Sequence, residues 1–338
     1  MLHLRHLSVL ALAVTTLLSS AQEAPAPASA PHADDAPAVR RQWHDINYAG
    51  DSLEAHTLDI YLPAITLDNI EVRKGGVQID KVVVLIYGSA WFANNAKDKA
   101  FAYFGRPLLD AGFAVVSINH RSSIDAKFPA QLHDVKAALR FIRAHAYEYG
   151  LDTTFVGITG YSSGGHLSAL AGVTCGMTER TVGGTTIDVE GSVGGNLGYS
   201  SSVDAVVDWF GPVDMLRMED CSTVKDARSP EAALIGGAPA EHPDLISLIS
   251  PISYITEGDS TLPPFLVIHG DADSVVPYCQ SVYFSDVLRE AGCLDDFITV
   301  PGGEHGPRTF NDETFKRMTD FFLREAQSSS RSTGQTKE

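Results

Sequence analysis

The pattern Gly160-x-Ser162-x-Gly164 is where residue types and spacing in this chain first suggest a reaction. It lies in residues 155–172, FVGITGYSSGGHLSALAG, a run that reads as a buried strand, a glycine-rich corner and a helix. Glycines two residues to either side let the backbone turn tightly enough to hold the serine hydroxyl clear of the strand. The spacing therefore predicts a nucleophile at Ser162, with a helix-capping serine as the structural alternative.

Asp273 and His305 lie in loops that follow two later apolar runs, in the segments GDADSVVP and PGGEHGP. A serine hydroxyl is a weak nucleophile at neutral pH, so His305 is expected to take its proton, and Asp273 to fix the tautomer of the imidazole. The order serine, aspartate, histidine predicts a catalytic triad with Ser162. Asp271 lies in the same turn as Asp273 and competes with it for this role.

Strand-like and helix-like segments alternate along the chain and would position these residues. The predicted strands are 56–62, 81–87, 113–119, 155–159, 202–210, 264–269 and 296–300, and the predicted helices are 101–111, 129–150, the one after Ser162, 278–291 and 310–326. This alternation predicts a mainly parallel sheet with helices on both faces. Reactive groups are then expected in the loops at the carboxyl ends of the strands.

The first 21 residues have the features of a secretory signal peptide. Arg5 lies near the start, residues 7–18 form an apolar run too short to span a bilayer, and small residues end at a cleavage site after Ala21. Export from a bacterial cell, to the periplasm or beyond, is therefore expected. The periplasm and the cell exterior are oxidising, so disulfides are possible.

One domain is expected in the exported part. Residues 22–42 are rich in alanine and proline and predict a flexible leader, and 43–327 predict a single α/β domain. Within it, 212–262 contain no evident strand and predict a small insertion above the active site. The polar residues 328–338 predict a disordered tail.

From about residue 45 to 326 the chain resembles the α/β-hydrolase esterases, above all the BD-FAE-like branch, which is related to feruloyl and acetylxylan esterases and to the hormone-sensitive-lipase-like carboxylesterases. The matching segments are LDIYLP (58–63), FPAQLHDVKAALRFIRAHA (128–146), GYSSGGHL (160–167), VVDWFGPVDM (206–215), HGDADSVVPYCQS (269–281) and PGGEHG (301–306). The resemblance implies the α/β-hydrolase fold. Its spacing selects Asp273 over Asp271, which becomes a turn residue.

The resemblance also implies an oxyanion hole made by the backbone N–H groups of Ser163, Ser89 and Ala90. The family usually has H-G-G-G-W or H-G-G-A-W where this chain has YGSAW at residues 87–91. Serine and alanine still supply the backbone N–H groups that an oxyanion hole uses. Ser89 is expected to be strained wherever the loop requires a glycine-only conformation.

Several further residues have structural interpretations. Trp91 and Tyr161 are expected to line the substrate pocket, with the core as the alternative for Trp91 and for Trp209. His166, on the helix after Ser162, is expected to be packed and structural.

Arg121 and Asp134 are expected to form an ion pair that ties a loop to the predicted helix 129–150. This ion pair has no catalytic role in the prediction.

The composition of the chain indicates which classes of binding partner to expect. The net charge of −17 argues against nucleic acid and anionic membranes. The spacing of cysteines and histidines predicts no metal site, and no cofactor is expected.

The four cysteines leave their pairing open. A continuous helix 278–291 would hold Cys279 and Cys293 too far apart to be bridged. Cys175 with Cys221 is the favoured disulfide, and buried free thiols are the alternative.

Together these observations predict an exported serine esterase that works through an acyl-enzyme. From the resemblance, the expected substrate is a small ester or an acylated plant polysaccharide that carries acetyl or feruloyl groups. The alternatives are an amide hydrolase of the kynurenine-formamidase type, a secreted serine peptidase, and a binding module on an inactive hydrolase scaffold. The sequence leaves the oligomeric state open.

Overall fold

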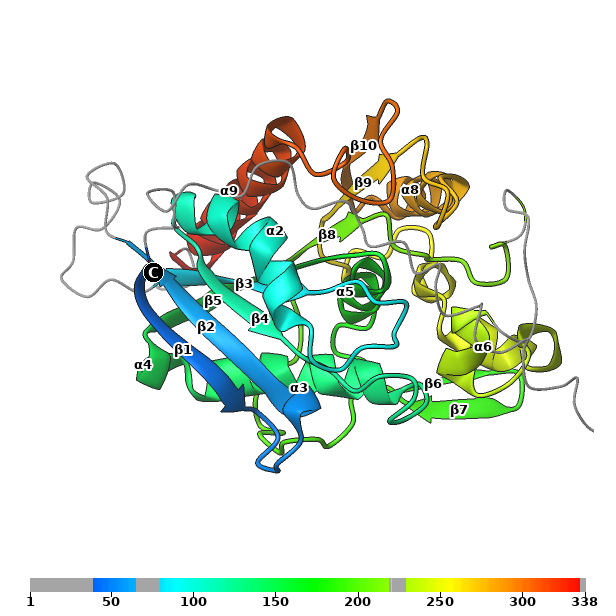
Figure 1. Cartoon of the computed structure of the whole chain (residues 1–338), viewed down its shortest axis with the longest axis horizontal. Coiled ribbons are helices and arrows are strands. Elements are labelled where there is room, and N and C mark those ends of the chain that lie inside the picture. Colours follow the sequence, from blue (N-terminus) through cyan, green and yellow to red (C-terminus); the bar gives the residue numbers. More distant parts are fainter. Residues whose placement is uncertain (1–38, 65–79, 219, 221–228, 335–338) are drawn as a thin grey trace, which may run out of the picture. The chain divides into compact units, whose positions relative to one another are not determined.

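An eight-stranded sheet lies at the centre of the part of the chain that this computed structural model describes, which is residues 39–64, 80–218, 220 and 229–334. The strands follow the spatial order β1-β2-β4-β3-β5-β8-β9-β10 (Figure 1). β1 and β2 pair antiparallel, as do β2 and β4, and the strands from β4 to β10 are parallel. Their bounds are Val39–Asn47 (β1), Thr57–Pro63 (β2), Asp80–Ile86 (β3), Ala114–Ile118 (β4), Leu151–Tyr161 (β5), Ala205–Trp209 (β8), Phe265–Gly270 (β9) and Leu294–Val300 (β10).

Helices connect these strands. The longer ones are α2 (Lys97–Asp110), α3 (Ala130–Ala144), α5 (Ser163–Val173), α8 (Cys279–Ala291) and α9 (Asp312–Gly334). The shorter ones are α4 (Ala146–Tyr149), α6 (Pro230–Ile235) and α7 (Pro243–Leu248), with 3₁₀ turns η2 (Glu54–His56), η3 (Pro239–Glu241) and η4 (Pro251–Tyr254).

β3 shows why helices cover both faces of the sheet. Successive side chains of a strand point to opposite faces, and both sets are apolar here. Val82, Val84 and Ile86 pack in a core with residues of α3, α5 and α8, whereas the alternate residues pack in a second core with α2 and α9. This is the three-layer α/β-hydrolase architecture that the sequence predicts.

The predicted leader is too long by four residues. β1 begins at Val39, where the alanine- and proline-rich composition ends, and Trp43 lies opposite Ile60 of β2. The assignment of residues 39–42 to a flexible leader is therefore wrong. The predicted signal peptide, 1–21, and the rest of the leader lie outside the described residues.

The predicted disordered tail is also wrong up to Gly334, because α9 continues to that residue. The hydroxyls of Ser328 and Ser329 donate to the carbonyl oxygens of Arg324 and Glu325, 2.8 and 3.2 Å away. These two serine hydroxyls therefore find their partners on the preceding turn of the same helix.

Two further differences concern the middle of the chain. The predicted helix 129–150 is interrupted at His145 and forms α3 and α4, with Gly150 at φ 70° as the predicted stop. A hairpin of β6 (Glu179–Val182) and β7 (Thr185–Asp188) was not predicted. It packs against α7 in the predicted insertion, where the Gly184 N–H donates to Asp244.

The structure contradicts the predicted disulfide between Cys175 and Cys221. Cys175 carries a free thiol that contacts the carbonyl oxygen of Ala171, and Cys293 is also free. Cys279 is disulfide-bonded, and Cys221 lies outside the described residues. No described helix is long and apolar enough to cross a membrane.

Candidate active site

Ser162 sits at the corner between β5 and α5 with φ 56° and ψ −126°, a conformation that non-glycine residues rarely adopt. A Cβ at Gly164 would lie 2.3 Å from the carbonyl oxygen of Ile86, and one at Gly160 would lie 2.5 Å from the Gly164 carbonyl carbon. Both glycines are therefore required by the close approach of α5 to the sheet. Ser162 makes no side-chain capping bond to α5, so its hydroxyl is available for chemistry.

The structure brings together the three predicted triad residues. The imidazole of His305 lies between the other two, with Nε2 2.9 Å from Ser162 Oγ and Nδ1 2.7 Å from Asp273 Oδ2. They come from the loops after β5, β9 and β10, at the carboxyl ends of parallel strands. This is the geometry in which a histidine can take the proton of a serine hydroxyl.

The side chain of Asp273 is fully buried and accepts several hydrogen bonds. Its Oδ1 accepts from the N–H groups of Val275 and Val276 at 2.8 and 3.0 Å, while Oδ2 faces His305 and His269 at 2.7 and 3.2 Å. Burial alone would raise the pKa of Asp273, but hydrogen bonds from His269 and His305 outweigh it and hold this pKa well below its usual range. Asp273 therefore stays ionised to support an imidazolium.

The two loops that carry Asp273 and His305 are joined tightly. The Ala272 N–H donates to Gly303 O at 2.9 Å, and a Cβ at Gly270 would lie 2.3 Å from the Gly303 backbone. Asp271 accepts from the Gly302 N–H at 2.6 Å, which places it in the turn, as predicted, and away from the triad. Phe210, from the loop after β8, packs against the His305 ring with centroids 4.7 Å apart.

The predicted oxyanion donors differ in their availability. The Ser89 N–H already donates to Ser163 Oγ at 2.8 Å. The structure records no such bond, among the described residues, for the N–H groups of Ala90 and Ser163. The backbone strain expected at Ser89 lies instead at Ala90 and Trp91, whose φ angles are 50° and 61°. These are the two central residues of the turn from Ser89 to Phe92, and this turn places both in the left-handed region.

Trp91 lies in the core, which was the alternative to its predicted pocket role. It is 2% exposed and its Nε1–H donates to His166 Nδ1 at 3.2 Å. Tyr161 is partly buried and packs on Tyr103 and Phe310, and burial raises the pKa of its hydroxyl to about 12. Trp209 is fully buried.

His166 has the structural role that the sequence predicts. Its Nε2 lies 2.7 Å from the Ile249 carbonyl oxygen, so it bears the proton, and Nδ1 accepts from Trp91. Burial lowers the pKa of His166 to about 4 and keeps it neutral. The residue ties the start of α5 to the predicted insertion.

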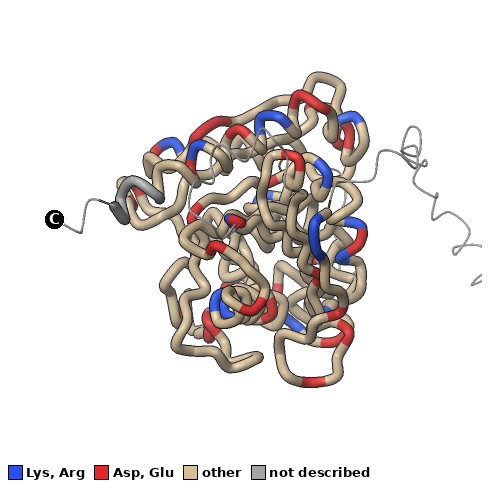
Figure 2. Tube along the Cα trace, turned by 90° about the vertical axis from the view of Figure 1, so that its left-hand side faces the viewer, with Lys and Arg blue, Asp and Glu red and all other residues tan. Residues whose placement is uncertain are grey.

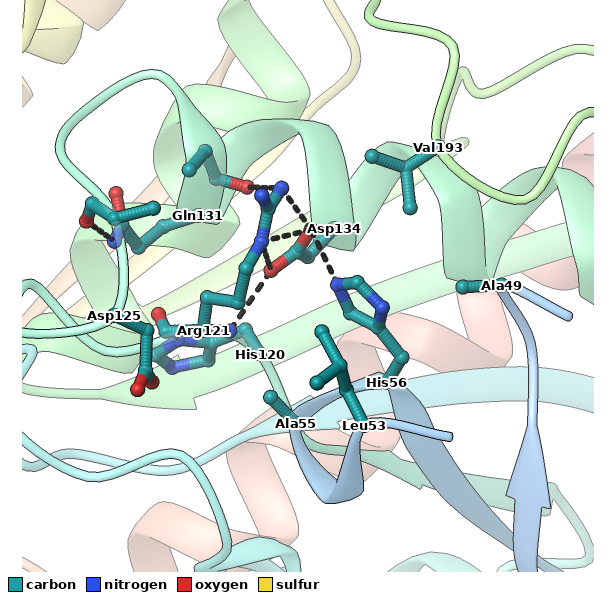
Figure 3. A network of polar contacts seen from close by, with 12 residues as sticks. Ala49, Leu53, Ala55, His56, His120, Arg121, Asp125, Gln131, Asp134 and Val193 are labelled. Carbon is teal, nitrogen blue, oxygen red and sulfur yellow. Dashed lines mark hydrogen bonds and ion pairs between the residues drawn. The ribbon is translucent and has the colours of Figure 1, made fainter. Parts of the chain in front are cut away.

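The predicted ion pair is present and larger than expected. Arg121 donates to the buried carboxylate of Asp134, with Nη2 2.6 Å from Oδ1. Figure 3 shows His56 reaching the same carboxylate, 3.2 Å away, and the other nitrogen of His56 lies 2.7 Å from Asp51. These four residues, the Asp134 network, join η2 and the loop after β4 to α3.

His269 and Phe210 are contacts of the triad that the sequence analysis missed. His269 lies four residues before Asp273 in HGDAD, so its spacing was a visible signal, whereas nothing in the sequence places Phe210 beside His305. In the described parts of the chain, no three His, Cys, Asp or Glu side chains are grouped so as to hold a metal ion.

The chain is similar to known esterases. The sequence model of the BD-FAE family matches residues 58–288. Esterase LipQ of Mycobacterium tuberculosis is 31% identical over 227 residues, which cover 66% of this chain and 49% of LipQ. Esterase LipC of the same organism is 33% identical over 229 residues, which cover 67% and 52%. This chain thus spans about half the length of these curated relatives.

Two solved structures have a higher sequence identity to this chain than LipQ and LipC do. A bifunctional GH43-CE protein of Bacteroides eggerthii is 61% identical with a TM-score of 0.78, over 84% of this chain and 35% of that one. A truncated carbohydrate esterase from gut microbiota is 53% identical with a TM-score of 0.80, over 88% of this chain and all of the other. With its α/β-hydrolase fold and the family match over most of its length, the chain belongs to the BD-FAE family.

Proposed function

We propose that this protein is a serine hydrolase of carboxylic esters. The observation that carries the proposal is the unbroken series of contacts from Ser162 Oγ through His305 to the buried carboxylate of Asp273. The esterase names of the similar proteins support the same reaction class.

The reaction proceeds in two stages. Ser162 Oγ attacks the ester carbonyl carbon while His305 Nε2 takes the hydroxyl proton. When the tetrahedral intermediate collapses, the bond to the alcohol breaks, that proton passes to the leaving oxygen, and the acyl group remains on Ser162. A water molecule then attacks the acyl carbon while His305 takes its proton; the bond between the acyl carbon and Ser162 Oγ breaks, the proton passes to Oγ, and the acid is released.

The negative charge of the tetrahedral oxygen is met by backbone N–H groups. Those of Ser163 and Ala90 are the available donors, since that of Ser89 is bound to Ser163 Oγ. One such donor contributes about 3–4 kcal/mol to transition-state stabilisation. The left-handed turn at Ala90 and Trp91 is the strained feature that accompanies this arrangement.

The proposed substrate is an acylated carbohydrate, with acetyl or feruloyl groups as the acyl part. One of the two solved structures described above is named a carbohydrate esterase, and the name of the other, the bifunctional protein, contains CE. We also propose that the protein is exported, because residues 1–21 have the pattern of a signal peptide. A secreted enzyme would meet polymeric substrates outside the cell.

The first test replaces the nucleophile. Ser162→Ala should abolish hydrolysis of p-nitrophenyl acetate and labelling by a fluorophosphonate, with an unchanged circular dichroism spectrum. Ser200→Ala is the matched control, because Ser200 lies in a second Gly-Tyr-Ser sequence and is exposed, and this variant should keep full activity. Retained activity in Ser162→Ala would remove this residue from the mechanism.

The substrate is tested on acetylated xylan, feruloylated arabinoxylan, simple aryl esters and a formyl amide, with product analysis. Release of acetate or ferulate from the polymers at rates above those on aryl esters is expected. Turnover of the amide alone would favour the formamidase alternative. No turnover together with no fluorophosphonate label would favour the binding module.

A further inference from the structure

We propose that His269 is a positioning residue for Asp273, so that the triad is held by a second histidine. The inference rests on the proposed function, because it assigns His269 a part in the same reaction. His269 is the next-to-last residue of β9 and is fully buried, so it does not contact substrate. It acts through the carboxylate.

The contacts of His269 indicate which of its ring nitrogens carries a hydrogen. Its Nε2 forms a hydrogen bond with the carbonyl oxygen of Val276 at 3.2 Å, and the same nitrogen lies 3.2 Å from Asp273 Oδ2 as an ion-pair contact. A carboxylate and a carbonyl oxygen can only accept, so Nε2 carries a hydrogen. Its Nδ1 lies 2.7 Å from Ser281 Oγ, and in the neutral imidazole this nitrogen accepts the Ser281 hydroxyl proton. The hydrogen on Nε2 therefore lies between the Val276 carbonyl oxygen and Asp273 Oδ2, and the Ser281 hydroxyl completes the hydrogen bonding of the ring.

The two histidines meet the same oxygen. Oδ2 of Asp273 receives His305 at 2.7 Å and His269 at 3.2 Å, while Oδ1 is held by two backbone N–H groups. The carboxylate consequently cannot rotate about its terminal bond without losing several hydrogen bonds. His269 therefore keeps an Oδ2 lone pair directed at His305 Nδ1 before substrate binds.

Packing keeps His269 in place. Its ring centroid lies 6.0 Å from that of Phe210 and 5.6 Å from that of Tyr278. Phe210 also packs on His305, so the two histidines share one aromatic neighbour. A substitution at His269 must preserve this ring volume if it is to report on the hydrogen bond alone.

The test uses two variants of His269. His269→Phe keeps an aromatic ring but cannot donate, and His269→Gln can place an N–H near the position of Nε2. For p-nitrophenyl acetate, His269→Phe should lower kcat about ten- to a hundredfold, the range for a hydrogen bond to a charged group. KM should change less than about twofold, and His269→Gln should recover most of the loss. The concentration of active sites is measured by fluorophosphonate titration, and kcat is calculated from that concentration. Misfolded protein therefore does not lower the measured kcat.

A double-mutant cycle separates positioning from a general structural role. If His269 acts through Asp273, His269→Phe should have little further effect on kcat in an Asp273→Ala background. An equal fold loss in both backgrounds, a His269→Gln as slow as His269→Phe, or a His269→Phe as fast as wild type would overturn the inference. A wild-type protein without esterase activity would instead contradict the proposed function, so the two failures are distinguishable.

Discussion

Asp208, the next-to-last residue of β8, is a buried acid that the proposed mechanism does not use. Its Oδ1 accepts from the Gly211 N–H at 3.0 Å, and among the described residues its Oδ2 has no hydrogen-bond partner. A Cβ at Gly165 would lie 2.3 Å from Oδ1, so this carboxyl lies directly against the first turn of α5. Burial raises the pKa of Asp208 to about 7.

The raised pKa of Asp208 predicts a pH dependence of stability. The folded protein holds this proton more tightly than the unfolded chain, so the stabilising contribution is complete below pH 3.8 and is lost as the pH rises to about 7. The loss is at most about 4 kcal/mol. Asp208→Asn cannot ionise, so its free energy of unfolding should fall less than that of wild type between pH 5 and 8. Urea unfolding of both proteins across this pH range measures the two free energies of unfolding.

The control for that experiment is Asp98→Asn, which removes an exposed carboxylate in the first turn of α2. Its pH dependence should follow the wild type. An Asp208→Asn curve parallel to that of wild type would mean that Asp208 is solvated or ionised in the folded protein.

At the scale of elements, the Asp134 network joins three segments of the chain that are distant in sequence. Asp134 from α3 binds Arg121 in the loop after β4 and His56 in η2 (Figure 3). Burial alone would lower the pKa of His56, but Asp134 and Asp51 outweigh it and raise this pKa. The pKa of Asp134 is lowered, since His56 and Arg121 overcome the effect of its burial.

These directions predict how the network responds to pH. The contribution of protonated His56 is fully present below about pH 6.5 and is lost as the pH rises through its higher folded pKa. His56→Gln should therefore lower the free energy of unfolding by about 2 kcal/mol at pH 6 and by less at pH 9. Chemical denaturation at the two pH values measures the difference.

His145→Gln is the matched control, because His145 pairs with Glu148 on the surface and both side chains are partly exposed. An exposed pair contributes little, so its effect should be small at both pH values. A loss in His56→Gln that grew toward pH 9 would contradict the raised pKa.

Most elements of the fold could be predicted from the sequence, because apolar runs such as 81–87 are buried on both faces and contrast sharply with their neighbours. The β6–β7 hairpin could not, since its strands are four residues long and largely exposed. The extent of α9 was missed because its last residues are polar and bond to their own backbone. Apolar periodicity carries no signal for either.

Some features of the candidate site could likewise be predicted from the sequence, and others could not. Ser162, Asp273 and His305 were predicted because each stands in a motif at the end of a strand. The engagement of the Ser89 N–H by Ser163 Oγ depends on how two distant loops pack, and the contact of Phe210 with His305 depends on the order of strands in the sheet. Neither is encoded in local spacing.

At the scale of the whole molecule, the net charge bears on the partners of the protein, and its cysteines bear on the proposed export. The chain has 42 acidic and 25 basic residues, and Figure 2 shows those of the described residues interspersed along the chain trace. Such an excess of one sign favours solubility and disfavours polyanionic partners.

The disulfide at Cys279 gives the last prediction, because disulfides persist in oxidising compartments and are rare in the cytosol. Cys175 and Cys293 are free, so denatured, unreduced protein purified from the periplasm should show two titratable thiols, and reduced protein four. Reduction should lower the free energy of unfolding by about 2–4 kcal/mol, since a cross-link restricts the unfolded chain.

A Cys175→Ser/Cys293→Ser variant is the control for this disulfide experiment. It should show no titratable thiol before reduction and the same loss of stability afterwards, because the cross-link is untouched. Periplasmic protein whose mature N-terminus is Gln22 would join this result to cleavage after Ala21. Four thiols in the unreduced periplasmic protein would instead show that the bond at Cys279 does not form there, and would remove the support that the disulfide lends to export.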